Sequence, residues 1–218
     1  QKLNLSRNNI GTAAGMDIIA VVGVKQSALT DLDMSSCGLR DPFVKELVNA
    51  LLAHNCLRRI QLSRNLLTCR GMDSLKYLYE TQDCKIADLA LGWNDIRTAG
   101  GTSLIQGFAT QGGWEDYQLT HVELPFCGLD DSISGQLGDW LGSNPPLVSL
   151  DLSHNRLGVE SAKMMSMALC CNTTVYSLNL SFNQLTTQGV CFFIDVLVHS
   201  QRTLNIKTMC SMIGVRSC

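Results

Sequence analysis

Apolar and polar residues alternate in a short pattern that recurs along the whole chain. Its centre is a pair of large apolar residues separated by one residue, and apolar residues at every second position share one face of a strand. Each copy therefore predicts a short strand with one buried face. The copies lie at Leu3/Leu5, Leu32/Met34, Ile60/Leu62, Leu89/Leu91, Val122/Leu124, Leu150/Leu152, Leu178/Leu180 and, more weakly, Leu204/Ile206.

A second pattern, with helical spacing, follows each predicted strand. From Phe43 to Leu52 apolar residues recur at every fourth position, each with an apolar neighbour, which forms one broad stripe on a helix. Successive copies begin 28 or 29 residues apart, except for one spacing of 33 and a last spacing of 26. A strand and a helix repeated at a fixed period predict a solenoid with a parallel sheet, because each crossover returns the chain to the same side. We therefore expect residues 1–218 to form a single α/β domain of seven to eight repeats.

An asparagine or a cysteine occupies the same place just after each predicted strand. There the backbone bends away from the sheet and leaves amide and carbonyl groups without strand partners. A buried asparagine offers donors and an acceptor to such groups, so we expect stacked copies to bond from one coil to the next. Cysteine fits the same small site, which argues against a nucleophilic role for it. The expected ladder residues are Asn8, Cys37, Asn65, Asn94, Cys127, Asn155 and Asn183.

Small residues mark the expected turns between strands and helices. Glycine tolerates the backbone conformations of a turn toward a helix, and asparagine tolerates the left-handed conformation that ends one. The glycines expected at such turns are Gly15, Gly71, Gly100, Gly158 and Gly189, and the asparagines expected at helix ends are Asn55, Asn144 and Asn172.

Together these patterns resemble the leucine-rich repeat family, specifically its ribonuclease-inhibitor-like class. The resemblance covers nearly the whole chain and rests on the period near 28, the long helical halves and the segments LNLSRNNI, LTDLDMSSCGL, LRRIQLSRNLL, IADLALGWNDI, LTHVELPFCGL, LVSLDLSHNRL and VYSLNLSFNQL. It implies a horseshoe with parallel strands on the concave face and helices on the convex face. No capping segment precedes Leu3, and the last repeat, near residues 202–218, is degenerate, with Met209 where an eighth asparagine would stand. We interpret the chain as a fragment of a longer one.

The same alternation predicts which residues face a partner. The residue before each ladder position is basic or small in the early repeats and aromatic in the later ones. Neighbouring strands lie ~4.8 Å apart, so the aromatic residues would form a stripe of large, rigid side chains, as interface anchors do. Acidic residues beside the stripe favour a partner with a basic surface. The candidate partner-binding residues on the concave face and ascending loops are Arg64, Asp88, Trp93, Glu123, Phe126, Asp151, His154 and Phe182.

Alternatives remain open for these residues. The rings could fold sideways and shield the loops instead of facing a partner. His121 and His154 could be ordinary polar surface residues, and no cysteine or histidine group has the spacing of a zinc site. The sequence therefore predicts no metal and no cofactor.

The spacing of 33 places four to five extra residues within 110–118. This segment contains glycines, acids and aromatic residues, which makes it a candidate for a second contact loop. It could equally be a tolerated insertion, because loops lengthen at little cost. The contact residues expected there are Trp114, Glu115, Asp116 and Tyr117.

Composition limits the classes of partner and the compartment. A net charge of −2 and a pI near 6.1 give no bulk reason to expect nucleic acid or an anionic membrane as a partner. No stretch reaches the ~20 apolar residues of a membrane span, and no secretory signal opens the chain. The ten cysteines in a long, leucine-rich chain indicate reduced, mostly buried thiols, and hence a cytoplasmic location, with a cilium or another large assembly as an alternative.

No catalytic residue is predicted, because the phosphate-binding loop, the HExxH zinc motif and the GxSxG nucleophile motif are all absent. The leading hypothesis is a non-catalytic protein-binding module. An alternative is a structural subunit of a cytoskeletal, axonemal or organellar complex, with its terminal repeats buried in the assembly. A third hypothesis, suggested by the family resemblance, is a GTPase activator of the Ran-activating type.

Overall fold

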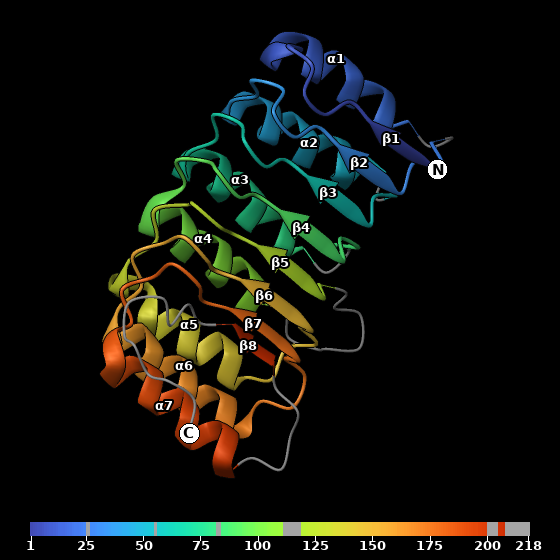
Figure 1. Cartoon of the computed structure of the whole chain (residues 1–218). Helices are drawn as coiled ribbons and strands as arrows, with labels where there is room; N and C mark the ends of the chain where they lie inside the picture. The colour runs from blue at the N-terminus through green and yellow to red at the C-terminus, as the bar shows by residue number, and fades with distance from the viewer. Residues whose placement is uncertain (25–26, 55, 82–83, 111–118, 200–204, 208–218) are drawn as a thin grey trace.

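The computed structural model describes residues 1–24, 27–54, 56–81, 84–110, 119–199 and 205–207. Within this part of the chain, eight short strands form one parallel sheet in chain order. In the same described residues, seven α-helices lie side by side in a row that covers one face of this sheet (Figure 1). The chain is therefore an open α/β solenoid, as the repeat pattern predicts.

Each coil contains one strand followed by one helix. The strands are β1 (Lys2–Asn4), β2 (Asp31–Asp33), β3 (Arg59–Gln61), β4 (Asp88–Ala90), β5 (His121–Glu123), β6 (Ser149–Asp151), β7 (Ser177–Asn179) and β8 (Asn205–Lys207). The helices are α1 (Gly11–Val22), α2 (Asp41–Ala53), α3 (Cys69–Glu80), α4 (Arg97–Ala109), α5 (Ser134–Gly142), α6 (Val159–Cys171) and α7 (Thr186–His199), with a 3₁₀ turn, η1 (Asp131–Ile133), before α5.

The strand register agrees with the predicted repeats in the first seven coils, but not in the eighth. Leu178 pairs with Ile206, so the last spacing is 28 residues and the expected match to Leu204 is wrong. A shift of two residues leaves the same side chains on the same face of a strand, so alternation alone does not distinguish the two registers. The eighth ladder position then falls on Ser211 instead of Met209, outside the described residues.

The core lies between the sheet and the helices. The central strand residues Leu32, Ile60, Leu89, Val122 and Leu150 expose at most 1% of their surface. The helical stripe that begins at Phe43 is buried against them, apart from Leu52, which is exposed. Each coil thus covers the apolar interior of its neighbours, which is the source of stability in a solenoid.

The glycines expected at turns have a different role. Gly15, Gly71, Gly100 and Gly189 lie inside helices, and Gly158 is the residue before α6. None of the five has a left-handed φ angle. A Cβ atom on Gly100 would lie 2.9 Å from the Cα of Cys69, so a side chain is excluded there by close packing between coils and not by a turn.

The asparagines expected at helix ends also differ from one another. Asn144 has a φ of 59° in the left-handed region, as expected. Asn172 has an extended backbone after α6, where its buried side chain donates to Leu141 O at 2.8 Å. Asn55 lies outside the described residues.

The half-buried carboxylate of Asp131 links one coil to the next. Asp131 in η1 accepts hydrogen bonds from Gly158 N at 2.6 Å, from Ser161 Oγ at 2.6 Å and from Ser161 N at 3.1 Å, at the start of α6. Burial by itself would raise the pKa of Asp131, but the bonds from Ser161 and Gly158 outweigh it and lower the pKa below its usual value. The ionised form of Asp131 is therefore part of the contact between η1 and the start of α6.

The lowered pKa of Asp131 predicts that the protein loses stability in acid. The pKa of this carboxyl is lower in the folded chain than the ~3.9 of an unfolded aspartate. The ionised carboxylate of Asp131 therefore makes its full contribution to the free energy of unfolding at pH values above the unfolded pKa. That contribution is lost as the pH falls through the folded pKa. Asp131→Asn should be less stable than the wild type at pH 7 and should lose less stability between pH 5 and pH 3, measured by urea unfolding. The matched control is Asp139→Asn, at an exposed position of α5; parallel pH curves for wild type and Asp131→Asn would contradict the prediction.

The cysteines differ in part from the expectation. All eight that lie in the described part of the chain are free thiols. Cys37, Cys84 and Cys127 are buried, but Cys170, Cys171 and Cys191 are exposed. The expectation that most of the thiols are buried is therefore wrong. Among the described helices, none has the length and apolar character that crossing a membrane requires.

Candidate binding surface

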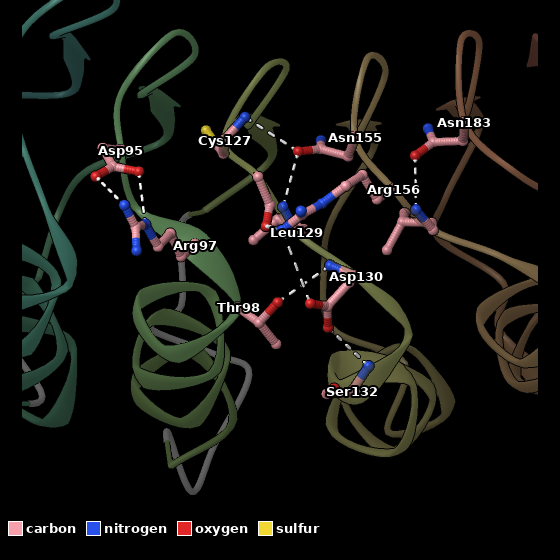
Figure 2. Close-up of polar contacts among 12 residues, drawn as sticks. Asp95, Arg97, Thr98, Cys127, Leu129, Asp130, Ser132, Asn155, Arg156 and Asn183 are labelled. Atoms are coloured by element: carbon pink, nitrogen blue, oxygen red, sulfur yellow. Dashed lines mark hydrogen bonds and ion pairs between the residues drawn. The ribbon is translucent and has the colours of Figure 1, made fainter.

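Asparagine side chains tie several of the coils to the coil before them, as Figure 2 shows for the coil of Asn155. Asn155 Oδ1 accepts from Cys127 N at 3.0 Å and from Leu129 N at 3.1 Å, while Asn155 Nδ2 donates to Leu124 O at 2.8 Å and to Leu152 O at 2.9 Å. The amide thus pairs backbone groups of two coils at the point where both leave the sheet. These contacts are structural and hold the adjoining loops in place.

The other positions of the expected ladder follow this geometry to different extents. Asn65, Asn94 and Asn183 each donate to carbonyl groups of their own coil and of the preceding coil. Asn8 donates only within its own coil, to Leu5 O and Ser6 O. Cys37 and Cys127 occupy the same place, and burial raises the pKa of Cys127 to about 12. Such a thiol is not a thiolate nucleophile near neutral pH.

The residue before each ladder position has a left-handed backbone. In this column of seven residues φ lies between 55° and 62°, although none is glycine. That conformation is unfavourable for a residue with a Cβ by ~1 kcal/mol or more. Because all seven share it, their side chains leave the chain in the same direction. The left-handed column is Arg7, Ser36, Arg64, Trp93, Phe126, His154 and Phe182.

The later members of the left-handed column form a continuous stack. The ring centroids of Trp93 and Phe126 are 3.6 Å apart, those of Phe126 and His154 are 4.0 Å apart, and those of His154 and Phe182 are 3.9 Å apart. The planes of these pairs are inclined by only 23°, 13° and 13°. At the first end, the guanidinium carbon of Arg64 lies 4.2 Å from the centroid of the Trp93 ring. Five consecutive coils therefore contribute one planar group each.

The ring stack lies at the surface. Trp93 is 42% exposed and Phe182 is 52% exposed, while Phe126 and His154, between them, are half-buried. The rings cover one another's faces, so they present their edges outward.

Charged side chains form a second row across the first strands of the sheet. Asp31 lies 3.4 Å from Lys2 Nζ and 3.6 Å from Arg59 Nη1, and Arg59 Nε donates to Asp88 Oδ2 at 2.6 Å. Asp88 Oδ1 lies 3.0 Å from His121 Nδ1. Asp88 is therefore already engaged by two neighbours and is less available to a partner than its sequence position indicates.

The other predicted carboxylates lie on the next row of the same face. Glu123 lines a hollow of about 230 Å³ over β3, β4 and β5, together with Gln61, Asp88 and His121. Burial raises the pKa of Glu123, and repulsion from Asp151 and Asp88 adds to the rise. Asp151 is half-buried and accepts from Asn179 Nδ2 at 2.9 Å. Glu123 lies in the hollow but its side chain is still exposed at the surface, whereas Asp88 and Asp151 are half-buried, so Glu123 is the predicted acid most open to a partner.

Sequence reasoning did not identify the contacts that Arg59 and His121 make with Asp88. The available signal was the alternation of sign along one column, from Lys2 through Asp31, Arg59 and Asp88 to His121, at the repeat spacing. The expected contact loop with Trp114, Glu115, Asp116 and Tyr117 lies outside the described residues. Among the residues that the structure does describe, no three metal-ligating side chains form a group that could hold an ion.

Comparison with known proteins gives three findings. A family model described as "Leucine Rich repeat" matches residues 1–18, 143–166 and 171–190. The chain is 27% identical over 198 residues to NACHT, LRR and PYD domains-containing protein 5 of Bos taurus, covering 90% of this chain and 18% of that protein. It is 25% identical over 214 residues to the ribonuclease inhibitor of Sus scrofa, covering 96% of this chain and 46% of that protein. The chain therefore spans less than half the length of either relative.

A solved structure also resembles this fold. An internalin from Listeria monocytogenes aligns with a TM-score of 0.48 at 14% sequence identity. The alignment covers 95% of this chain and 60% of the internalin chain.

Proposed function

We propose that this chain, a leucine-rich repeat protein of the ribonuclease-inhibitor-like class, is a non-catalytic module that binds a protein partner through its concave face and ascending loops. The observation that carries the proposal is the stack from Arg64 to Phe182, which extends over five coils. Large side chains stand at backbone positions where they are unfavourable. Stacking fixes them before a partner arrives, which lowers the ordering cost of binding.

The chemistry of this surface supports a partner with apolar anchors and basic groups. Ring edges carry a partial positive charge and pack against aromatic faces and aliphatic groups. Glu123, in the neighbouring hollow, would attract a basic side chain. The proposed interface is therefore mixed, with apolar contacts along the rings and a charged contact on the strands.

A cytoplasmic, reducing environment is part of the proposal. Cys170, Cys171 and Cys191 are exposed free thiols on the last two described helices. Exposed thiols remain reduced in the cytosol but form disulfides in oxidising compartments. This supports the proposed location.

Loss of the ring stack should weaken partner capture. Trp93→Ala and Phe182→Ala each remove an exposed ring, and truncation of an interface anchor costs about 1.4 kcal/mol or more, which is at least a tenfold rise in Kd. The measurement is calorimetric titration of a partner isolated from native extract, together with thermal unfolding to show that the fold is retained. The matched control is Tyr77→Ala, which removes a ring with similar exposure (57%) from helix α3. Unchanged affinity in both stack variants would reject the proposed surface.

The same experiment tests a structural role in a larger assembly. Val21 on α1 and Val198 on α7 are strongly exposed apolar residues on the first and last described helices. In a structural subunit such residues would be buried by neighbouring components. Loss of the partner in Val21→Asp or Val198→Asp, with full affinity in Trp93→Ala, would favour this second candidate.

A further inference from the structure

The hollow over β3, β4 and β5 lies where an alanine interrupts a row of longer side chains. Ala90 on β4 is in register with Gln61 on β3 and with Glu123 on β5, so the three side chains leave the same face of the sheet. Ala90 has the smallest side chain of this row. The hollow of about 230 Å³ is lined by all three residues. Alanine at position 90 therefore leaves room for a group that this coil does not supply.

The charged groups around the hollow leave one carboxylate without a cation. Arg59 and Asp88 both line the hollow, and Arg59 Nε donates to Asp88 Oδ2 at 2.6 Å. Asp88 Oδ1 also lies 3.0 Å from His121 Nδ1. Within the described part of the chain, the carboxylate of Glu123 forms no ion pair and no hydrogen bond. The charges of Arg59 and Asp88 offset each other, so the uncompensated charge of the lining is that of Glu123.

The surroundings of Glu123 favour a cation over an anion or an apolar group. Desolvation and repulsion from Asp151 and Asp88 disfavour its ionised form and so raise its pKa. A bound cation would relieve both effects, whereas an anion would add a further repulsion. In the described part of the chain no three metal-ligating side chains form a group, so a cationic side chain fits this position better than a metal ion does.

The opposite wall of the hollow offers a second acceptor. Gln61 is half-buried, and among the described residues its side-chain amide has no hydrogen-bond partner. An amide oxygen accepts hydrogen bonds from the N–H groups of an ammonium or a guanidinium. A cationic group over Ala90 would thus find a carboxylate on one side and an amide oxygen on the other.

The hollow adjoins the ring stack. Trp93 follows Ala90 by three residues in the same coil, and Phe126, stacked on Trp93 at 3.6 Å, follows Glu123 by three residues in the next coil. A partner that places a cationic group over Ala90 therefore brings its neighbouring residues to the edges of these two rings. The surface fits a basic residue with an apolar residue close to it.

We propose that the hollow over Ala90 is the position at which this surface selects its partner, and that it takes one lysine or arginine side chain of that partner. Glu123 supplies the countercharge, Gln61 supplies the second acceptor and Ala90 supplies the space. This inference rests on the proposed function, since it names a contact of the same surface. It adds the residue that sets the size of the contact and the number of basic side chains that the contact accepts.

The test uses amino-acid amides as probes and needs no partner. N-acetyl-lysinamide and N-acetyl-argininamide are titrated separately into the 13C-labelled protein at neutral pH, and NMR follows the methyl signal of Ala90 and the carboxylate signal of Glu123. Saturable shifts with a millimolar Kd are expected for at least one probe, and the tighter probe identifies the basic side chain. N-acetyl-norleucinamide, which lacks the ammonium group, should give no saturable shift.

Two variants separate the charge of the hollow from its space. Glu123→Gln keeps the shape and removes the charge, so the basic probe should bind about tenfold more weakly. Ala90→Leu keeps every charge and fills the hollow, so saturable binding should disappear. The matched control is Asp33→Asn, which removes a carboxylate from the same row but outside the lining, and its affinity should stay within about twofold of the wild type. Thermal unfolding shows that each variant is folded.

Several results would overturn the inference. These are an unchanged Kd in Glu123→Gln, saturable binding that persists in Ala90→Leu, equal shifts with the norleucine probe, or no saturable shift with either basic probe. Glu123→Gln alters an exposed side chain, so it decides the question even where Ala90→Leu does not fold. The probe result does not depend on partner capture, so failure here is distinguishable from failure of the Trp93→Ala test. If both proposals hold, Ala90→Leu also weakens partner capture.

Discussion

Asn65→Ala should lower the free energy of unfolding by about 3–5 kcal/mol. Asn65 is buried, and its carbonyl oxygen accepts from Cys37 N and Leu39 N, both at 3.0 Å. Its amide donates to Met34 O at 3.0 Å. Alanine would leave these three buried backbone groups without a partner, at about 1–3 kcal/mol each before relaxation. The measurement is equilibrium unfolding in urea.

The first coil provides the matched control for this substitution. Asn8 occupies the same ladder position but is exposed and bonds only to its own coil. Asn8→Ala should cost less than about 1 kcal/mol, because water replaces the lost hydrogen bonds. Equal losses in the two variants would show that the bonds between coils contribute nothing beyond the local turn.

Gly107→Ala should destabilise the protein by about 1–3 kcal/mol, although alanine is the better helix former. Gly107 lies in α4, where an added Cβ would be 2.9 Å from the Cα of Lys76 and 3.1 Å from its carbonyl oxygen in α3. Both atoms belong to a helical backbone and do not move aside as a side chain would. The two helices must separate, and the loss is read as a lower midpoint in thermal or urea unfolding.

Gly135 is the control for helix propensity. It lies in α5, and an added Cβ would meet nothing within 4 Å. Gly135→Ala should therefore raise stability by about 0.5 kcal/mol, through the lower entropy of the unfolded chain. A gain in both variants would show that α3 and α4 do not pack as closely as described.

The sequence predicted the repeating parts of the fold well. Alternation located the strands of seven coils, because a strand with one buried face must place its large apolar side chains at alternate positions. The eighth coil shows the limit of that signal. Both Leu204 and Ile206 fit the alternation, and pairing with β7 selects Ile206.

The candidate surface was predictable by position but not by interaction. Sequence alignment of the repeats placed Trp93, Phe126 and Phe182 in one column. It did not show that they stack face to face, because that depends on a left-handed backbone that no single repeat reveals. Nor did it show that Asp88 is paired with Arg59, since both side chains could have pointed to solvent.

By itself the sequence determined the period, the alternation of strand and helix and the residue types in each column, because these are properties of one coil and its burial. Only the tertiary structure decided which planar groups touch, which charges are paired and which helical glycines are irreplaceable. Those features depend on atoms of two coils about 28 residues apart in sequence, whose separation of a few ångströms is set by the stacking of the solenoid.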